Sequence, residues 1–310
     1  MFHDETDSRI DRRENRLTSA VHIPVLAEII LDKISLGKDS VFVDCTLGQG
    51  GHADLISKML GASGRLVGFD VDQKSLDCAA NVLADAECKV ALVKSNFCRI
   101  TENLHRLGID KVDFILADIG FCSAQIADPE RGMSFQENMP LDMRLDDTLT
   151  VTAADIVNRM PEEELANLIY EFGEERASRR IAAMIAAQRT HHKITSTSQL
   201  AALIARAVGG RGKLHPATKT FQALRIAVNK ELDVLSSLLQ QAPELLNSGG
   251  KIAIISFHSL EDRIVKEDFK KNKEEGIYNI LTKKPLTASE SEKKENPRSR
   301  SAKLRIAERV

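Results

Sequence analysis

The sequence predicts an α/β protein in which an all-helical segment interrupts a parallel sheet. Short apolar runs recur in the first half and are separated by stretches with helical spacing, which is typical of strands joined by right-handed crossovers. Between roughly residues 126 and 215 no strand pattern occurs, so a helical insertion is expected there. The chain has 310 residues, 43% of them hydrophobic, which is enough for one large domain or two ordinary ones.

Four strands are predicted in the first half. The apolar runs at residues 41–45, 65–70, 89–93 and 112–117 are the candidates, and residues 52–60 and 73–84 have helical spacing between them. We therefore assign residues 21–125 to the sheet domain, which resumes at residues 216–310 and encloses a helical domain at 126–215.

The second half changes from helices back to strands. Residues 161–189 read as helical, with Pro161 placed to open the helix, and a second amphipathic stretch stops at Gly209. One long helix should follow, limited by Pro243; its apolar face is formed by Phe221, Leu224, Val228, Leu232 and Leu235. The run KIAIISF resumes the sheet, KLRIAERV should supply an edge strand, and residues 282–296, rich in Lys, Glu and Ser, are expected to form a mobile loop.

Composition narrows the class of protein. The five cysteines are scattered and form no C-x-x-C pair, which indicates free thiols in a reducing cytoplasm and no metal site. His191, His192 and His215 show no metal spacing either. Residues 1–20 are expected to be a disordered extension, because the first sixteen mix both charges and lack the apolar core of a signal peptide. No apolar run approaches the ~20 residues that span a bilayer, so no membrane contact is expected.

Charge is segregated along the chain although the net charge is only −2. Residues 141–175 contain ten acidic residues and two arginines, whereas residues 191–230 contain seven Lys or Arg and no acid. The last thirty residues carry nine Lys or Arg and four Glu. Such segregation can create a basic face for a polyanion on a nearly neutral protein, although solvated helix faces would give the same pattern. Aromatic residues make up only 4%, which disfavours an RNA module built on base stacking.

The stretch VFVDCTLGQGGH predicts a site for a cofactor that contains ribose. It combines a strand that ends at Asp44 with a glycine-rich turn that enters a helix, and Asp70 ends the next strand. A carboxylate at Asp70 can accept hydrogen bonds from ribose hydroxyls. Asp44 would repel a pyrophosphate but suits the sulfonium and ammonium groups of S-adenosylmethionine.

A third carboxylate, Asp118, ends the fourth strand within LADIGFCSAQ. Ligands in such sheets lie outside the carboxyl ends of the strands, so Asp44, Asp70 and Asp118 should border one crevice. After the fifth strand, the stretch SFHSLED resembles a hydrolase set, but no G-x-S-x-G elbow precedes it. We expect His258 either to line the substrate side of the crevice or to belong to a helix cap.

Several motifs in this order resemble the ribosomal RNA small subunit methyltransferase H family: DCTLGQGGH, DIGFCSAQ, ERGMSF, PLDMRLD, FGEERASRRIA, HPATKTFQALRIAVNKEL, ISFHSLEDRIVK and NPRSRSAKLR. The resemblance covers about residues 22–310. It implies a class I, Rossmann-like methyltransferase sheet with an inserted helical domain. It also implies methyl transfer from S-adenosylmethionine to the exocyclic N4 of a cytosine in the decoding region of bacterial 16S ribosomal RNA.

The resemblance assigns cofactor contacts to seven positions, namely Gly50, Gly51, His52, Asp70, Phe97, Asp118 and Gln125. Asp118 is also the candidate catalytic group, since a carboxylate that accepts a hydrogen bond from the cytosine amino group would make that nitrogen a better nucleophile. This chain departs from the family pattern, which usually reads D-L-G-V-S-S-P-Q-L-D and R-G-F-S, at Phe121, Cys122, Ala124, Ala127 and Met133.

The RNA side is predicted from charge. Cations near the crevice mouth are needed for phosphate contacts, and the candidates are Lys219, Arg225, Arg298 and Arg300. The RNA could be naked, or part of an assembled or assembling subunit.

Three other functions remain open at this point. A methyltransferase of the same fold could act on a small molecule or a protein, which the large insertion and the acid-free basic run disfavour. A cofactor-binding RNA protein without catalysis is the second, and an NAD oxidoreductase is the least favoured because G-x-G-x-x-G is absent.

Overall fold

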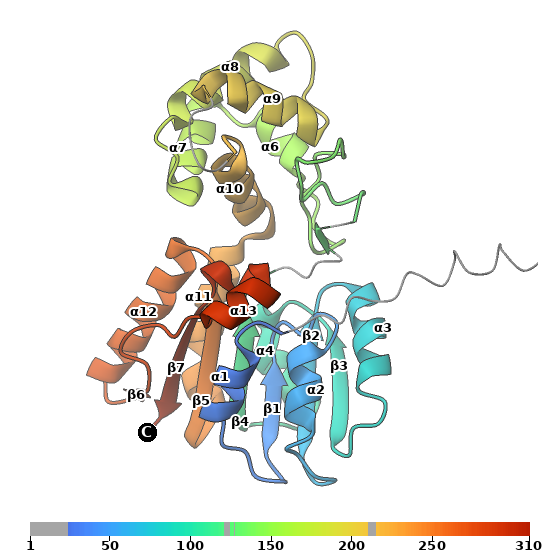
Figure 1. The fold of residues 1–310 in the computed structure, drawn as a ribbon, viewed down its shortest axis with the longest axis vertical. Coiled ribbons are helices and arrows are strands. Elements are labelled where there is room, and N and C mark those ends of the chain that lie inside the picture. Colours follow the sequence, from blue (N-terminus) through green and yellow to red (C-terminus); the bar gives the residue numbers. More distant parts are fainter. Residues whose placement is uncertain (1–23, 121–124, 127, 210–214) are drawn as a thin grey trace, which may run out of the picture.

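The computed structural model describes residues 24–120, 125–126, 128–209 and 215–310. The predicted extension at 1–20 and the substituted positions Phe121, Cys122, Ala124 and Ala127 lie outside the described residues. Within the described residues, seven strands form one sheet in the order β3-β2-β1-β4-β5-β7-β6 (Figure 1). The strands are β1 (Val41–Asp44), β2 (Arg65–Asp70), β3 (Lys89–Lys94), β4 (Val112–Asp118), β5 (Leu246–Ser256), β6 (Tyr278–Ile280) and β7 (Lys303–Arg309).

The sheet is parallel from β3 to β5, and β7 runs antiparallel to both of its neighbours. This arrangement, with the reversed β7 inserted beside β5, confirms the predicted class I methyltransferase sheet. The prediction of an edge strand for the C-terminal run was wrong in position. The edge is formed by the three-residue strand β6. Sequence analysis missed this strand because its run is too short and too polar to give a strand pattern.

Helices cover both faces of the sheet (Figure 1). On one face α1 (Ala27–Lys33), α2 (Gly51–Ser57) and α3 (Gln73–Val82) pack in one core. On the other, α4 (Ile100–Arg106), α11 (Glu231–Leu245) and α12 (Ser259–Glu274) pack in a second. The alternation of a strand divides its residues between these cores, so that Phe42 packs in the first and Val43 in the second.

The helical insertion forms a separate unit above the sheet in Figure 1. Its elements are α6 (Ala153–Arg159), α7 (Glu162–Gly173), α8 (Ser178–Arg189), α9 (Thr197–Val208) and α10 (Thr218–Asn229), which share a third core. The predicted stretch at 161–189 is therefore two helices. The packing of this unit extends through α10, beyond the boundary predicted at residue 215.

The long helix predicted after residue 216 is two helices. Lys230 adopts a left-handed conformation, with φ 51° and ψ 39°, and separates α10 from α11. The apolar face of α10, including Phe221 and Leu224, packs in the helical unit, whereas Leu235 of α11 packs under the sheet. One apolar pattern thus serves two cores, and periodicity alone carries no mark of the break. Pro243 lies inside the last turn of α11, two residues before its end.

The segment at 282–296, predicted to be a mobile loop, contains structure. Leu286 pairs with Leu304 of β7 in an isolated bridge, and α13 (Glu290–Glu295) and the 3₁₀ helix η3 (Pro297–Ser301) follow. A second 3₁₀ turn, η2 (Phe97–Arg99), follows β3.

Among the described helices, none combines the length and the apolar composition that a bilayer span requires.

Candidate active site

A pocket opens at the carboxyl ends of β1, β2 and β4, at the point where parallel sheets bind ligands. One side of it is made by the ends of these strands and the glycine turn, and we call this the cofactor side. The other side is made by residues 142–149, which we call the strap, together with Asn229 and Glu231 at the break between α10 and α11. We call this the substrate side.

The glycine turn is closed by the backbone of the neighbouring strand. The N–H of Leu47 donates to the carbonyl of Phe69 at 2.9 Å, and the N–H of Gly48 donates to the Asp70 carboxylate at 2.9 Å. Gly50 has φ 86° and caps α2, and a Cβ at this position would lie 3.3 Å from Ala79. Gly50 therefore lets the turn enter α2 against α3, and it does not itself line the pocket.

Asp70 is held in place by two backbone donors. Besides Gly48, the N–H of Asp72 donates to its other carboxylate oxygen at 2.8 Å. Burial raises the pKa of Asp70 above its ordinary value, while these two hydrogen bonds oppose the rise. Its oxygens retain lone pairs that face the pocket edge, where ribose hydroxyls could donate.

Asp44 lies behind the glycine turn, 2% exposed. Its carboxylate accepts from the N–H of Thr46 at 3.0 Å. Burial raises the pKa of Asp44 to about 6, although the nearby His52 lowers it in part. Asp44 does not line the pocket, so the expectation that it borders the crevice together with Asp70 and Asp118 was wrong. It lies behind the lining residues Cys45 and Thr46, where a cation bound in the pocket would still favour its ionised form.

Asp118 is placed by the hydroxyl of Thr46, which accepts the Asp118 N–H at 2.7 Å. One carboxylate oxygen lies 3.8 Å from Nε2 of His52. The other, Oδ1, is buried and has no hydrogen-bond partner among the described residues, and the same holds for Nε2 of His52. Buried polar groups are normally paired, so these two atoms mark a place where a ligand belongs.

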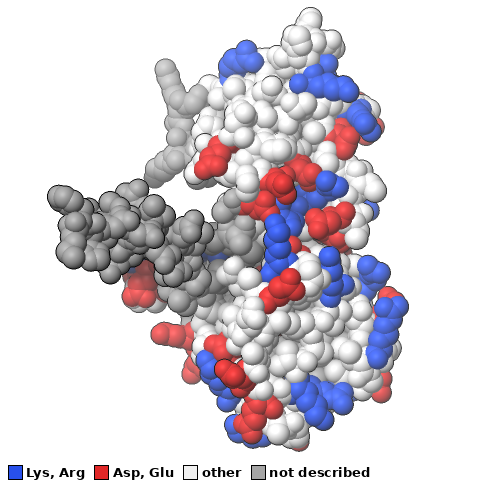
Figure 2. All heavy atoms as spheres, turned by 90° about the vertical axis from the view of Figure 1, so that its right-hand side faces the viewer, with Lys and Arg blue, Asp and Glu red and all other residues white. Residues whose placement is uncertain are grey.

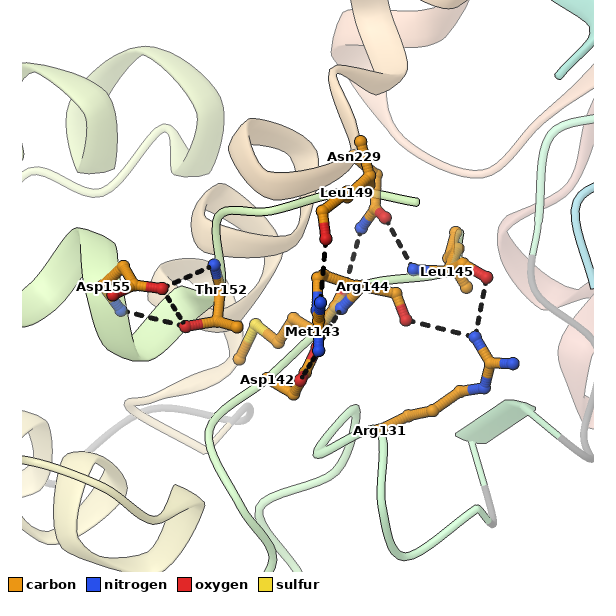
Figure 3. Close-up of polar contacts among 9 residues, drawn as sticks. All are labelled: Arg131, Asp142, Met143, Arg144, Leu145, Leu149, Thr152, Asp155 and Asn229. Atoms are coloured by element: carbon orange, nitrogen blue, oxygen red, sulfur yellow. Dashed lines mark hydrogen bonds and ion pairs between the residues drawn. The ribbon is translucent and has the colours of Figure 1, made fainter. Parts of the chain in front are cut away.

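The strap is folded on itself by its own arginine. Arg144 pairs with Asp142 through two hydrogen bonds of 2.8 and 2.7 Å and donates to the carbonyl of Leu149 at 2.8 Å (Figure 3). This arrangement presents Leu145, Asp146 and Leu149 to the pocket.

Arg131 ties the strap to the cofactor side. It donates to the carbonyls of Arg144 and Leu145 at 3.1 and 2.7 Å (Figure 3). It also pairs with Asp72, two residues after Asp70, at 3.1 Å. The next residue, Gly132, has φ 60°, and a Cβ there would lie 1.9 Å from the carbonyl oxygen of Pro140. Glycine is therefore required where this segment passes the start of the strap.

Asn229 ties the strap to α10. Its side chain accepts from the N–H of Leu145 at 2.8 Å and donates to the carbonyl of Met143 at 2.8 Å (Figure 3). It also donates to the carbonyl of Arg225 at 2.9 Å. Two residues later, Glu231 forms a two-point ion pair with Arg225, with N–O distances of 2.7 and 2.8 Å. Glu231 is thus fixed in position, and it lines the pocket.

The charge of the pocket suits a cationic ligand. Apart from His52, its charged lining residues among those described are Asp70, Asp118, Asp146, Glu231 and Arg298. Four carboxylates against one guanidinium favour the sulfonium and ammonium groups of S-adenosylmethionine and disfavour a pyrophosphate. The residues present therefore fit the predicted cofactor.

Most predicted cofactor contacts lie in this pocket. The described lining includes Gly51, His52, Asp70, Phe97, Asp118 and Gln125, and omits Gly50. The other catalytic candidate, His258, does not line it. His258 is the N-cap of α12, where it forms a capping box with Glu261. This placement agrees with the helix-cap interpretation of the SFHSLED stretch.

The predicted RNA contacts occupy different environments. Arg298 lines the pocket, Lys219 is half-buried and donates to the carbonyl of Glu174 at 2.9 Å, and Arg300 is exposed on η3. Arg225 is only 15% exposed and is engaged with Glu231. On the face drawn in Figure 2, acidic and basic side chains are interspersed, particularly at the waist between the two parts of the molecule.

Reasoning from sequence missed the substrate side. Asp146, Asn229 and Glu231 were given no role, although PLDMRLD and AVNKEL were recognised as motifs, and Thr46 on the cofactor side was missed as well. The signal that could have identified the three substrate-side residues was their position inside these motifs, because the apolar pattern does not mark the break at Lys230.

This chain is similar in sequence to known methyltransferases. The model of the MraW methylase family matches residues 19–310. A ribosomal RNA small subunit methyltransferase H of Sorangium cellulosum is 47% identical over 291 residues, covering 93% of this chain and 91% of the relative. The protein of the same name in Clostridioides difficile is 40% identical and covers 93% of this chain and 99% of that one. Among solved structures, a putative rRNA-methylase from Clostridium thermocellum has a TM-score of 0.45 at 14% identity, covering 92% of this chain and 95% of that chain.

Proposed function

The chain belongs to the MraW methylase family, and we propose that it methylates the exocyclic N4 of a cytosine in the decoding region of bacterial 16S ribosomal RNA. It is an S-adenosylmethionine-dependent rRNA methyltransferase. The observation that carries the mechanism is the orphan Oδ1 of Asp118, buried in a pocket whose charge suits a sulfonium cofactor.

The cofactor, when bound, supplies an electrophilic methyl group. The protein must hold the cofactor and bring a weak nucleophile to it, since the lone pair of cytosine N4 is delocalised into the ring. Asp70 is placed to accept from ribose hydroxyls, and the glycine turn allows close approach of its backbone. The strap and Glu231 form the opposite wall, where the cytosine would enter.

Asp118 has two possible partners. Its Oδ1 could accept a hydrogen bond from the cytosine amino group, which would favour a pyramidal nitrogen and receive the proton lost on transfer. It could instead contact the cofactor, with His52 beside it. Both roles need the carboxylate in the pocket, but only the catalytic role requires that Asp118→Asn lose turnover while cofactor affinity is unchanged.

The RNA is proposed to approach over the sheet edge and the helical domain. This domain was predicted at residues 126–215, between the two parts of the methyltransferase domain at 21–125 and 216–310, and its core continues through α10. Arg300 is exposed, Lys219 is half-buried at the surface and Arg298 borders the pocket, so we expect these three cations to meet phosphates. Arg225 would act through Glu231 instead. Because ribosomal subunits are assembled in the bacterial cytoplasm, we expect the enzyme to work there.

The deciding experiment uses labelled S-adenosylmethionine with unmethylated small-subunit RNA, offered naked, in assembling particles and in assembled subunits. Nucleoside analysis should find label in N4-methylcytidine from at least one of these substrates. The productive substrate identifies the assembly stage. Label in another nucleoside would overturn the N4 assignment, and no label in RNA with bound cofactor would favour a protein that binds RNA without catalysis.

A further inference from the structure

Three side chains that could ligate a metal meet where two helices begin. Glu231 is the first residue of α11, His258 is the N-cap of α12, and Glu261 lies in the first turn of α12. One nitrogen or oxygen from each lies within 4.8 Å of the other two. Glu231 also lines the pocket, so the cluster adjoins the substrate side.

The helix cap uses one polar atom of His258 and one of Glu261 and leaves the other polar atom of each side chain without a partner among the described residues. Oε2 of Glu261 accepts from the backbone N–H of Phe257 at 2.8 Å and of His258 at 3.3 Å. Oε1 of Glu261 and Nε2 of His258 are buried and form no hydrogen bond with the described residues. The Glu261 side chain is 1% exposed, so solvent offers no replacement.

A shared metal ion would explain the short distance between Nε2 of His258 and Oε1 of Glu261. Nε2 of His258 and Oε1 of Glu261 lie 3.0 Å apart, yet they are not aligned as a hydrogen bond. Two ligands that hold one ion at ~2.0–2.2 Å, with angles between square and tetrahedral, are themselves about 3 to 3.5 Å apart. Atoms that are this close and do not point at each other fit a shared third partner.

Glu231 supplies the third ligand from a fixed position. Its two-point ion pair with Arg225 orients the carboxylate, and each carboxylate oxygen keeps a lone pair for another partner. Metal ligands are commonly held by such an outer hydrogen-bonding partner. The ligand atoms of the three side chains lie within 4.8 Å of one another. A small movement of the Glu231 carboxylate would bring its oxygen to the distance of about 3 to 3.5 Å that separates two ligands of one ion.

We propose that Glu231, His258 and Glu261 bind one divalent cation of the kind that accepts mixed nitrogen and oxygen ligands, with Zn²⁺ as the reference ion. One imidazole and two carboxylates form a donor set of this type. The ion would join the start of α11 to the start of α12 beside the pocket and offset two carboxylates where RNA phosphates must approach. It would also correct the expectation of no metal, because residues 27 positions apart give no metal spacing in sequence.

The test separates a metal ligand from a helix cap. His258→Asn keeps a side chain that caps helices well, and Glu261→Gln keeps the residue type that completes a capping box. Both changes remove a metal ligand. His105→Asn is the matched control, because His105 is an exposed histidine 3.9 Å from a carboxylate of Asp110.

The full chain, freed of metal with a chelator, is titrated with Zn²⁺ by calorimetry and with Co²⁺ by visible absorption. Wild type and His105→Asn should bind one equivalent at this site, and their melting temperature should rise with Zn²⁺. His258→Asn and Glu261→Gln should lose at least about tenfold in affinity, together with the rise in melting temperature.

Absence of a saturable equivalent in the wild type would overturn the proposal. So would equal binding by the two ligand variants, since the cluster would then be only a helix cap. The experiment needs neither RNA nor methyl donor, so its result is independent of whether the proposed methylation is found.

Discussion

The two sides of the pocket are built in different ways. On the cofactor side the carboxylates stand at strand ends and are held mainly by backbone donors, as Asp70 is by the N–H groups of Gly48 and Asp72, while the Thr46 hydroxyl positions Asp118. On the substrate side the groups are fixed by side chains, chiefly Arg131, Asn229 and Arg225. A sheet edge is therefore enough to place the cofactor, whereas the substrate wall depends on a small number of side-chain contacts.

The cofactor side should be the more sensitive to a change in chemistry. Asp118→Ala should lose methyl transfer by about 10²–10⁴-fold, the range expected for a general base, because it removes the orphan oxygen from the pocket. Turnover and cofactor affinity are measured separately, the second by calorimetry.

Asp118→Asn is the matched variant, since it keeps the size and an acceptor oxygen. Loss of turnover with unchanged cofactor affinity would assign Asp118 to the cytosine amino group. Weaker cofactor binding with near-normal turnover at saturation would assign it to the cofactor. Near-normal turnover together with unchanged affinity rejects the catalytic role.

The substrate side should be the more sensitive to a loss of support. Asn229→Ala removes three hydrogen bonds to backbone groups of the strap and α10, which should lower the free energy of unfolding by about 2–3 kcal/mol. The freed strap should also raise KM for RNA more than it lowers cofactor affinity. Chemical unfolding and separate titrations measure these effects.

The exposed Asn81 on α3 provides the control for Asn229. Asn81→Ala should leave stability within about 0.5 kcal/mol, as surface substitutions usually do. If Asn229→Ala behaves like this control, the strap is held by Arg131 and Arg144 alone, and the contrast between the two sides fails.

The cofactor side should also respond to pH. Burial raises the pKa of Asp44 to about 6, above the ordinary 3.8, so the folded protein without cofactor keeps this group protonated in mildly acidic solution. A bound cation favours the ionised form, so affinity for S-adenosylmethionine should rise by up to about tenfold between pH 5 and 7.

Asp44→Asn should remove this dependence of affinity on pH, and calorimetry between pH 5 and 7 would show it.

The stability of the cofactor-free protein should change with pH in the opposite direction from cofactor affinity. The folded state binds more protons than the unfolded state between pH ~4 and ~6, so the cofactor-free protein should lose stability as pH rises through that window. A pH-independent affinity in the wild type would contradict the coupling.

The different construction of the two sides also explains why the sequence predicted the cofactor side of the pocket and missed the substrate side. Asp44, the glycine turn, Asp70 and Asp118 follow strands that apolar runs mark clearly, and parallel strand ends meet at one edge. Asn229 and Glu231 flank a left-handed Lys230, where the apolar pattern continues unbroken through a change of core. Periodicity reports which face is buried but not against what, so the break and the wall built on it required the structure.

The smallest effect is expected for Lys219, a half-buried cation at the junction of the two units. Lys219 contacts Glu174, which also accepts from Ser259 and pairs with Arg263 at the start of α12. If Lys219 meets one RNA phosphate, Lys219→Ala should weaken RNA binding a few-fold and reduce the slope of log K against log salt by about 0.7. Lys58→Ala is the control, because Lys58 caps the end of α2 that points away from the pocket. An unchanged slope in Lys219→Ala would put the RNA elsewhere and leave the substrate side of the pocket without its proposed approach path.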